Sequence, residues 1–83
     1  MAAVPEVRSE VEELIRRLVD QPEKVKVAEF PSGDEILLEV EVAPEDLGKV
    51  IGRQGRTVRA LRTLLETRNA REAIPYGLEI IED

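Results

Sequence analysis

The chain has 83 residues and a net charge of −6, enough for one small domain with little core to spare. Its apolar residues make up 42% of the chain and include only two aromatics, Phe30 and Tyr76, so the core must be aliphatic. The absence of Cys and His excludes a disulfide framework and argues against thiolate or imidazole metal sites and the usual nucleophile–base pairs of enzymes. No apolar run approaches the roughly 20 residues of a membrane span. The composition therefore predicts a cytoplasmic, non-enzymatic protein without a membrane segment or cofactor.

The first predicted element is an amphipathic helix over residues 5–19, after a disordered start at residues 1–4. Apolar residues recur there at helical spacing, and Pro22 should stop the helix. Two strands follow, over 24–30 and 35–42, and both alternate apolar with charged residues. A turn at 31–34 should join them into an antiparallel hairpin with one wet face. The inward positions are Val25, Val27, Ile36, Leu38, Val40 and Val42.

Two consecutive helices are predicted in the second half of the chain. The first begins near Pro44 and ends at Gly52, and the second opens near Arg56 or Thr57. A connection over 69–73 leads to a final strand over 77–81. The second helix should bury Val58, Leu61, Leu64 and Leu65. The element order α-β-β-α-α-β predicts a single α+β domain across residues 1–83.

The charge of the chain is distributed unevenly. Between Lys49 and Arg71 there are seven basic residues and one acid, Glu66, which gives this segment +6 and leaves −12 for the remainder. Such asymmetry predicts a positive face on a negative body. The basic residues are Lys49, Arg53, Arg56, Arg59, Arg62, Arg68 and Arg71.

The basic segment contains a Gly-x-x-Gly loop, Gly52–Gly55, between the two consecutive helices. Two glycines three apart let the backbone turn tightly and let a ligand approach its N–H groups. Because helix N-termini attract anions, a phosphate chain is the natural candidate for that ligand. The sequence therefore predicts a nucleic-acid contact at this loop.

The run Val50–Val58, in this element order, resembles the type II KH (K-homology) RNA-binding domain. That resemblance implies helices packed on one face of a three-stranded sheet. The segments Asp46–Gly52 and Arg62–Leu65, in a stand-alone domain of this size, are similar to the small bacterial KhpA family. Membership would imply RNA binding and an RNA chaperone role in post-transcriptional regulation, linked to cell elongation, cell shape and envelope homeostasis. It would also imply pairing with a larger KH-containing protein of the KhpB type.

KH loops clamp about four nucleotides of single-stranded RNA through the RNA backbone. The glycines would admit phosphates, Arg53 and Gln54 would hydrogen-bond phosphate or 2′-OH oxygens, and neighbouring cations would add charge. Val50, Ile51 and Val58, with part of the hairpin strand, should form the floor of an apolar groove that receives the bases. The expected RNA-binding residues are Lys49, Val50, Ile51, Gly52, Arg53, Gln54, Gly55, Arg56, Val58 and Arg59.

Two other functions fit parts of the pattern. A helix-turn-helix DNA binder also joins two helices by a Gly-containing turn, but its flanking strands and short first helix would be unusual. A protein-binding adaptor could use the same basic face against an acidic partner. Because one short groove binds RNA weakly, a homodimer or a second KH protein is expected to raise affinity. The expected surface is either an exposed strand edge or the apolar segment Ile74–Tyr76, of which the second is favoured.

Overall fold

The computed structural model describes residues 6–69 and 74–82, and within this part the predicted element order is confirmed. Short 3-10 turns lie at Pro22–Lys24, Pro44–Asp46 and Arg53–Gly55. The predicted disorder of residues 1–4 and most of the predicted connection over 69–73 lie outside the described residues. The helices and strands are α1 (Val7–Arg16), β1 (Lys26–Ser32), β2 (Glu35–Glu41), α2 (Leu47–Ile51), α3 (Arg56–Asn69) and β3 (Tyr76–Ile80).

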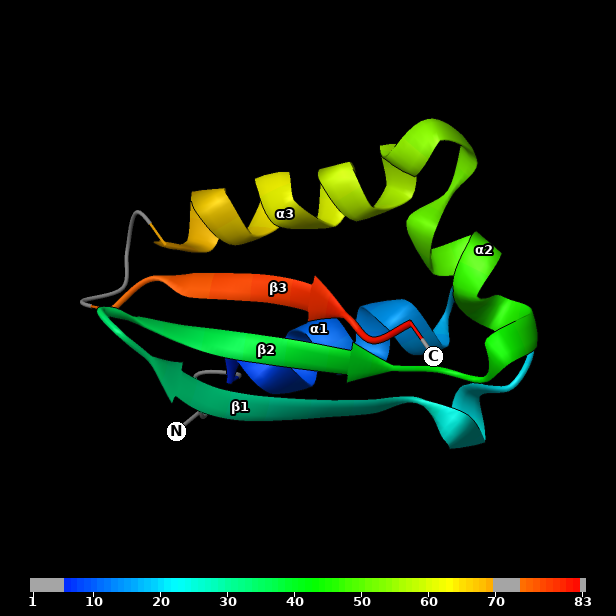
Figure 1. Ribbon diagram of the computed structural model, residues 1–83, viewed down its shortest axis with the longest axis horizontal. Helices are drawn as coiled ribbons and strands as arrows, with labels where there is room; N and C mark the ends of the chain where they lie inside the picture. Colours follow the sequence, from blue (N-terminus) through cyan, green and yellow to red (C-terminus); the bar gives the residue numbers. More distant parts are fainter. Residues whose placement is uncertain (1–5, 70–73, 83) are drawn as a thin grey trace, which may run out of the picture.

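The three strands form one mixed sheet in the order β1-β2-β3. β1 and β2 pair antiparallel, as predicted, with Val27 opposite Val40. The predicted turn over 31–34 is too long, because Pro31 and Ser32 still pair with β2 and only residues 33–34 form the turn. β3 pairs parallel to β2 with Leu38 opposite Leu78. A parallel pair cannot be joined by a tight turn, so α2 and α3 serve as the crossover between β2 and β3. This crossover carries the glycine loop (Gly52–Gly55) to the end of the molecule opposite the β1–β2 turn (Figure 1).

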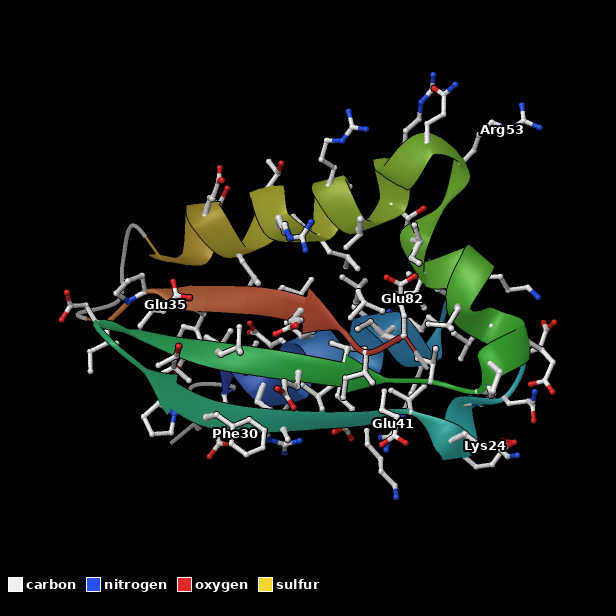
Figure 2. All side chains as sticks on the ribbon, viewed as in Figure 1. Lys24, Phe30, Glu35, Glu41, Arg53 and Glu82 are labelled. Atoms are coloured by element: carbon white, nitrogen blue, oxygen red, sulfur yellow. The ribbon has the colours of Figure 1, made fainter. Side chains whose placement is uncertain are left out.

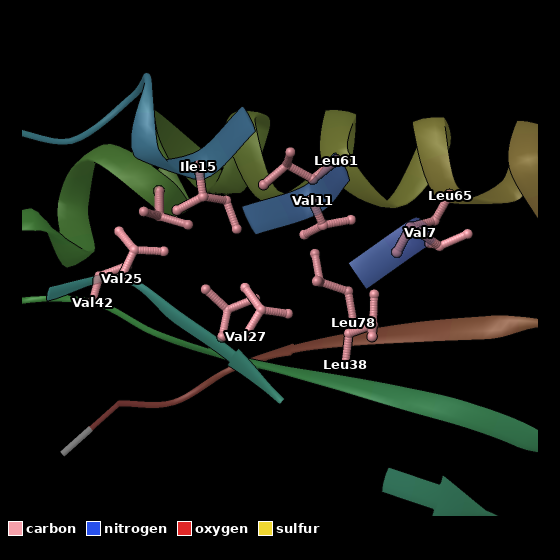
Figure 3. Packing of buried hydrophobic residues seen from close by; sticks show 12 residues of the cluster. Val7, Val11, Ile15, Val25, Val27, Leu38, Val42, Leu61, Leu65 and Leu78 are labelled. Carbon is pink, nitrogen blue, oxygen red and sulfur yellow. The ribbon is translucent and has the colours of Figure 1, made fainter. Parts of the chain in front are cut away.

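An aliphatic core lies between the sheet and the helices α1 and α3 (Figure 3). Leu38 and Val40 of the central strand are completely buried, and so is Ile15 of α1. Phe30 is 46% exposed and contributes nothing to this core, which confirms that the core is aliphatic. The buried apolar side chains are Val7, Val11, Ile15, Val25, Val27, Leu38, Val40, Val42, Val50, Leu61, Leu65 and Leu78.

The prediction that Leu64 is buried is wrong, because its side chain is 57% exposed. Leu61 and Leu65 lie about 40° apart around α3, whereas Leu64 lies about 60° from Leu61 on the other side. Leu64 therefore falls at the border of the apolar stripe. It lines a shallow groove between α1 and α3 together with Leu14.

A buried carboxylate fixes the start of α2. Asp46 is 1% exposed and accepts hydrogen bonds from the backbone N–H groups of Asp20 (3.2 Å) and Gln21 (3.0 Å). These bonds satisfy the carboxylate and tie the segment after α1 to the turn that precedes α2. Because α2 leads directly into the glycine loop, Asp46 helps to determine where that loop lies.

Candidate nucleic-acid interface

The backbone of the glycine loop is held in an unusual conformation. Gly52, Gln54 and Gly55 have φ angles of 78°, 56° and 73°, so three of the four residues have positive φ. Positive φ is favourable for glycine and costly for a residue with a Cβ. At Gly52 a second constraint applies, because a Cβ there would collide with the side chain of Thr57. Only glycine fits this position.

Two backbone donors of the loop are left for a ligand. The N–H of Gly52 donates to the carbonyl of Gly48 (2.8 Å), and the N–H of Gly55 donates to that of Gly52 (3.1 Å). Within residues 6–69 and 74–82, by contrast, neither the N–H of Arg53 nor that of Gln54 has a hydrogen-bond acceptor. Both residues are exposed and lie two and three positions before Arg56, where the 14-residue helix α3 begins. Free N–H groups beside a helix N-terminus favour an anion such as phosphate.

Arginines surround these donors. Arg53 projects from the tip of the glycine loop, away from the body of the molecule (Figure 2). Arg56 and Arg59 are exposed on the first turn of α3. One turn further, Nη2 of Arg62 donates to the carbonyl of Leu78 on β3 (3.2 Å). Three arginines, Arg53, Arg56 and Arg59, therefore lie in the loop or on the first turn after it, and Arg62 lies between α3 and β3.

Lys49 differs from these arginines because its charge is already compensated. Its Nζ lies 2.7 Å from Oδ2 of Asp20 and 3.7 Å from Oδ1 of Asp46. The hydrogen bond and the charge of Asp20 raise the pKa of Lys49 above its ordinary value of 10.5, because they stabilise its protonated form. Sequence reasoning expected Lys49 to offer its charge to RNA. In the structure Lys49 forms an ion pair that joins α2 to the segment after α1, and its contact with RNA stays a prediction.

The apolar residues predicted to floor the groove occupy different positions. Val50 has no exposed surface and belongs to the core, so it can support the loop only from beneath. Ile51 and Val58 are half-buried and retain surface on the two sides of the loop. Of the three strands, β3 has the most contact with α3, whereas the sequence suggested part of the hairpin for this place. The half-buried Ile80 of β3, together with Val58, packs against the edge of the core.

Sequence reasoning left Ile80 and Arg62 out of the site. The alternation of apolar residues marked Ile80 as a strand residue, but only the parallel pairing of β3 with β2 places that strand beside α3. No local pattern predicts such a long-range pairing. Arg62 was identified as one of the basic residues, and its bond to the β3 backbone could not be read from spacing.

Other kinds of site find little support. Among the described residues, no cluster of three potential metal ligands is present. In the same part of the chain, none of the helices has the length and apolarity needed to cross a membrane.

Comparisons with known proteins agree on one family. The family model described as "KhpA/KhpB, KH domain" matches residues 8–80. The chain is 44% identical over 70 residues to the RNA-binding protein KhpA of Chlamydia caviae, covering 84% of this chain and 90% of that protein. It is 44% and 45% identical over 71 residues to the proteins of the same name from Clostridium acetobutylicum and Clostridium perfringens, covering 86% of this chain and 95% of each relative.

Proposed function

The chain belongs to the KhpA/KhpB KH-domain family, and from this premise we propose that it binds single-stranded RNA through the glycine loop and the adjacent apolar surface. The observation that carries the proposal is the pair of unpaired N–H groups of Arg53 and Gln54 at the N-terminus of α3. The similar proteins of Chlamydia and Clostridium are named RNA-binding proteins, which supports the same class of ligand.

In this proposal the loop binds the sugar–phosphate backbone and the apolar surface receives the bases. Phosphate oxygens accept hydrogen bonds from the two free N–H groups, while Arg53 and Arg56 supply mobile charge-assisted donors. The half-buried side chains of Ile51, Val58 and Ile80 contact the bases. KH loops clamp about four nucleotides in this manner.

Base stacking on aromatic side chains plays no part in this proposal. Phe30 lies on β1, the strand furthest from β3 in the sheet, and Phe30 alternates with core residue Val27 to the opposite face. Tyr76 lies at the start of β3, whereas Ile80 at its end is the residue assigned to base contact. The arrangement therefore favours a short groove over the aromatic platforms of RRM and OB folds.

A DNA-binding helix-turn-helix fits the structure less well. Its first helix would be α2, which has only five residues. The turn would be the glycine loop, in which two backbone N–H groups have no acceptor among the described residues. Sequence reading by a recognition helix uses Asn, Gln or Arg toward base edges. In α3 the only such residues with described side chains are Arg56, Arg59 and Arg62, the last of which is bonded to Leu78.

A salt titration tests the proposed function. If three or four phosphates are bound, log K for a single-stranded RNA oligonucleotide should fall with log salt at a slope of roughly −2 to −3. Duplex DNA of the same length should bind more weakly at every salt concentration, because a single-strand groove cannot accept it. Fluorescence anisotropy measures both series. A flat response to salt would support the adaptor function instead, and tighter binding of duplex DNA would support the helix-turn-helix function.

The cellular role that we propose follows the family. Weak and reversible binding of short single-stranded segments suits a cytoplasmic RNA chaperone in post-transcriptional regulation. From the family we also propose that this chain acts in the control of cell elongation and envelope homeostasis. The proposal includes no enzymatic step and no cofactor. The proposed site consists of backbone N–H groups and arginine side chains, and these do not form the hydrogen-bonded pair of nucleophile and base that covalent catalysis uses.

We further propose that the chain functions as a homodimer, or as a heteromer with a larger KH-containing protein of the KhpB type. One groove of this size binds near the roughly 10⁻⁴ to 10⁻⁶ M range of non-specific contacts, and joining two grooves raises the affinity through effective concentration. Ile74, which is 50% exposed beside β3, supports the apolar surface predicted at Ile74–Tyr76.

Sedimentation equilibrium at micromolar concentration is expected to give about twice the monomer mass of 9.3 kDa, or a heteromer mass once the KH partner is added. Ile74→Glu should weaken this association because it places a charge in the contact. Leu64→Glu, at another exposed apolar position, serves as the matched control. A 9.3 kDa species with and without RNA and the partner would refute the proposal, and loss of association in the Leu64 variant alone would move the interface to the α1–α3 groove.

A further inference from the structure

Arg59 makes a contact that the proposed function does not use. Its Nη2 donates a hydrogen bond of 2.6 Å to the backbone carbonyl of Gln54, five residues earlier in the chain. The same guanidinium lies close to Gly55, with Nη2 3.9 Å from the point where a Cβ would stand. The side chain is therefore folded back over the glycine loop.

The carbonyl that Arg59 holds belongs to the most strained residue of the loop. Gln54 is the only described non-glycine residue with positive φ, at φ 56° and ψ 26°. A residue with a Cβ persists there only when its surroundings hold it in place. The side chain of Gln54 makes no hydrogen bond in the described part of the chain. The peptide group between Gln54 and Gly55 is held within the loop by the N–H of Gly55, which donates to the carbonyl of Gly52, and from outside the loop by the bond from Arg59.

We infer that Arg59 is a positioning residue: it locks the left-handed conformation of Gln54 and thereby keeps the N–H groups of Arg53 and Gln54 turned outward to receive phosphate. This inference rests on the proposed RNA binding and revises the earlier expectation that Arg59 contacts RNA itself. The carbonyl of Gln54 shares its peptide plane with the N–H of Gly55. The φ and ψ angles of Gln54 set the angle between that plane and the preceding one, which contains the N–H of Gln54. Holding Gln54 in the left-handed conformation therefore fixes the orientation of its N–H relative to the rest of the loop. Binding then costs less ordering of the loop.

Direct phosphate binding by Arg59 predicts a different signature. A guanidinium that neutralises a phosphate contributes about −0.7 to the slope of log K against log salt for single strands. A guanidinium engaged with a protein carbonyl changes affinity without changing this slope. Arg56 is the matched control, because it is an exposed Arg on the same turn of α3 and makes no side-chain hydrogen bond within the described residues.

The test compares Arg59→Met with Arg56→Met. In Arg59→Met the RNA affinity should fall about tenfold, the cost of one charge-assisted hydrogen bond, with the salt slope unchanged. In Arg56→Met the slope should become shallower by roughly 0.7. A slope reduced equally in both variants would overturn the inference and make Arg59 a phosphate ligand.

A double-mutant cycle between positions 54 and 59 adds a second criterion. Asn adopts the left-handed region more readily than Gln does, so Gln54→Asn should reduce the loss caused by Arg59→Met at least twofold. An unchanged loss in the Asn background would contradict a role through Gln54. The cycle also removes any contribution of the Gln54 side chain itself from the comparison.

A measurement without RNA separates the inference from the proposed function. Backbone ¹⁵N order parameters of residues 53–55 should decrease in free Arg59→Met and remain at parent values in Arg56→Met. If the parent chain fails to bind RNA while the loop loosens in Arg59→Met, the proposed function is refuted and the positioning contact stands. If the loop stays rigid in Arg59→Met, the positioning role is refuted whatever the RNA result.

Discussion

Replacing Arg53 and Gln54 together by Asp is expected to abolish RNA binding while leaving the fold intact. The double variant removes one positive charge and adds two negative ones, so the loop changes by three units beside the bound phosphates. At about 4 Å in water each unit contributes about 1 kcal/mol, which predicts a loss of roughly 100-fold at low salt. Because the two exposed side chains contribute nothing to the core, circular dichroism should give the parent spectrum and melting curve.

A second double variant controls for net charge. Lys24→Asp with Ser32→Asp makes the same change of three units on exposed residues, one in the 3-10 turn before β1 and one at the end of β1. Lys24 lies far from Arg53 in Figure 2, and Ser32 lies next to the β1–β2 turn, at the end of the molecule opposite the glycine loop (Figure 1). Its RNA affinity should fall severalfold at most, because charges beyond about 10 Å are screened at 0.1 M salt. Equal losses in the two double variants would show that overall charge, and not the loop, governs binding. Undiminished affinity in the loop variant would contradict the assignment of the site.

The element order was predictable because each element carries a local signal. Strand alternation, helical spacing and the stop signal Gly52 are all read within a few residues, and the structure confirms them. Pro22 is not what ends the first helix, because α1 already ends at Arg16 and Pro22 begins a separate 3-10 turn. The aliphatic character of the core was also predictable, because the composition contains only two aromatic residues. The burial of Leu64 was predicted wrongly, because a helix position at the border of the apolar stripe can face either the core or the solvent.

The candidate site was only partly predictable. The glycine spacing located the loop, and the arginine pattern located the positive charge. Spacing could not show that Lys49 is paired with Asp20, since these residues lie 29 positions apart in the sequence. It also could not show that Val50 has no exposed surface or that β3 lies beside α3, because both depend on how the crossover folds back onto the sheet.

The bond between Arg59 and Gln54 illustrates a limit of sequence patterns at short range as well. An Arg five residues after a Gln is unremarkable in a helical pattern, and a charged exposed residue beside a phosphate-binding loop is naturally assigned to the ligand. The left-handed backbone of Gln54 changes the assignment of Arg59, because the carbonyl of Gln54 accepts a hydrogen bond from the Arg59 side chain. Backbone conformation, and not residue spacing, therefore separates the positioning arginine from those left free for RNA.

The largest loss of stability is expected for Asp46→Ala. This change leaves the N–H groups of Asp20 and Gln21 without their acceptor in a part-buried turn and removes a carboxylate that is 1% exposed. Losing the partner of a buried donor costs about 1–3 kcal/mol, so two donors predict a loss of about 2–4 kcal/mol after partial access of water. That is a large share of the roughly 5–15 kcal/mol that stabilises a small domain. Urea unfolding, followed by circular dichroism, measures the change as a lower midpoint.

Two substitutions isolate the cause of this loss. Asp46→Asn keeps the size of the side chain and one acceptor oxygen, so its midpoint should lie between those of Asp46→Ala and the parent. Asp20→Asn removes only the exposed ion pair with Lys49, and its midpoint should stay close to the parent value because exposed pairs contribute little. If Asp46→Ala unfolded at the parent's urea concentration, the two backbone bonds would not anchor α2. If Asp20→Asn were the more damaging change, the anchor would be the ion pair, and the position of the glycine loop would then depend on salt.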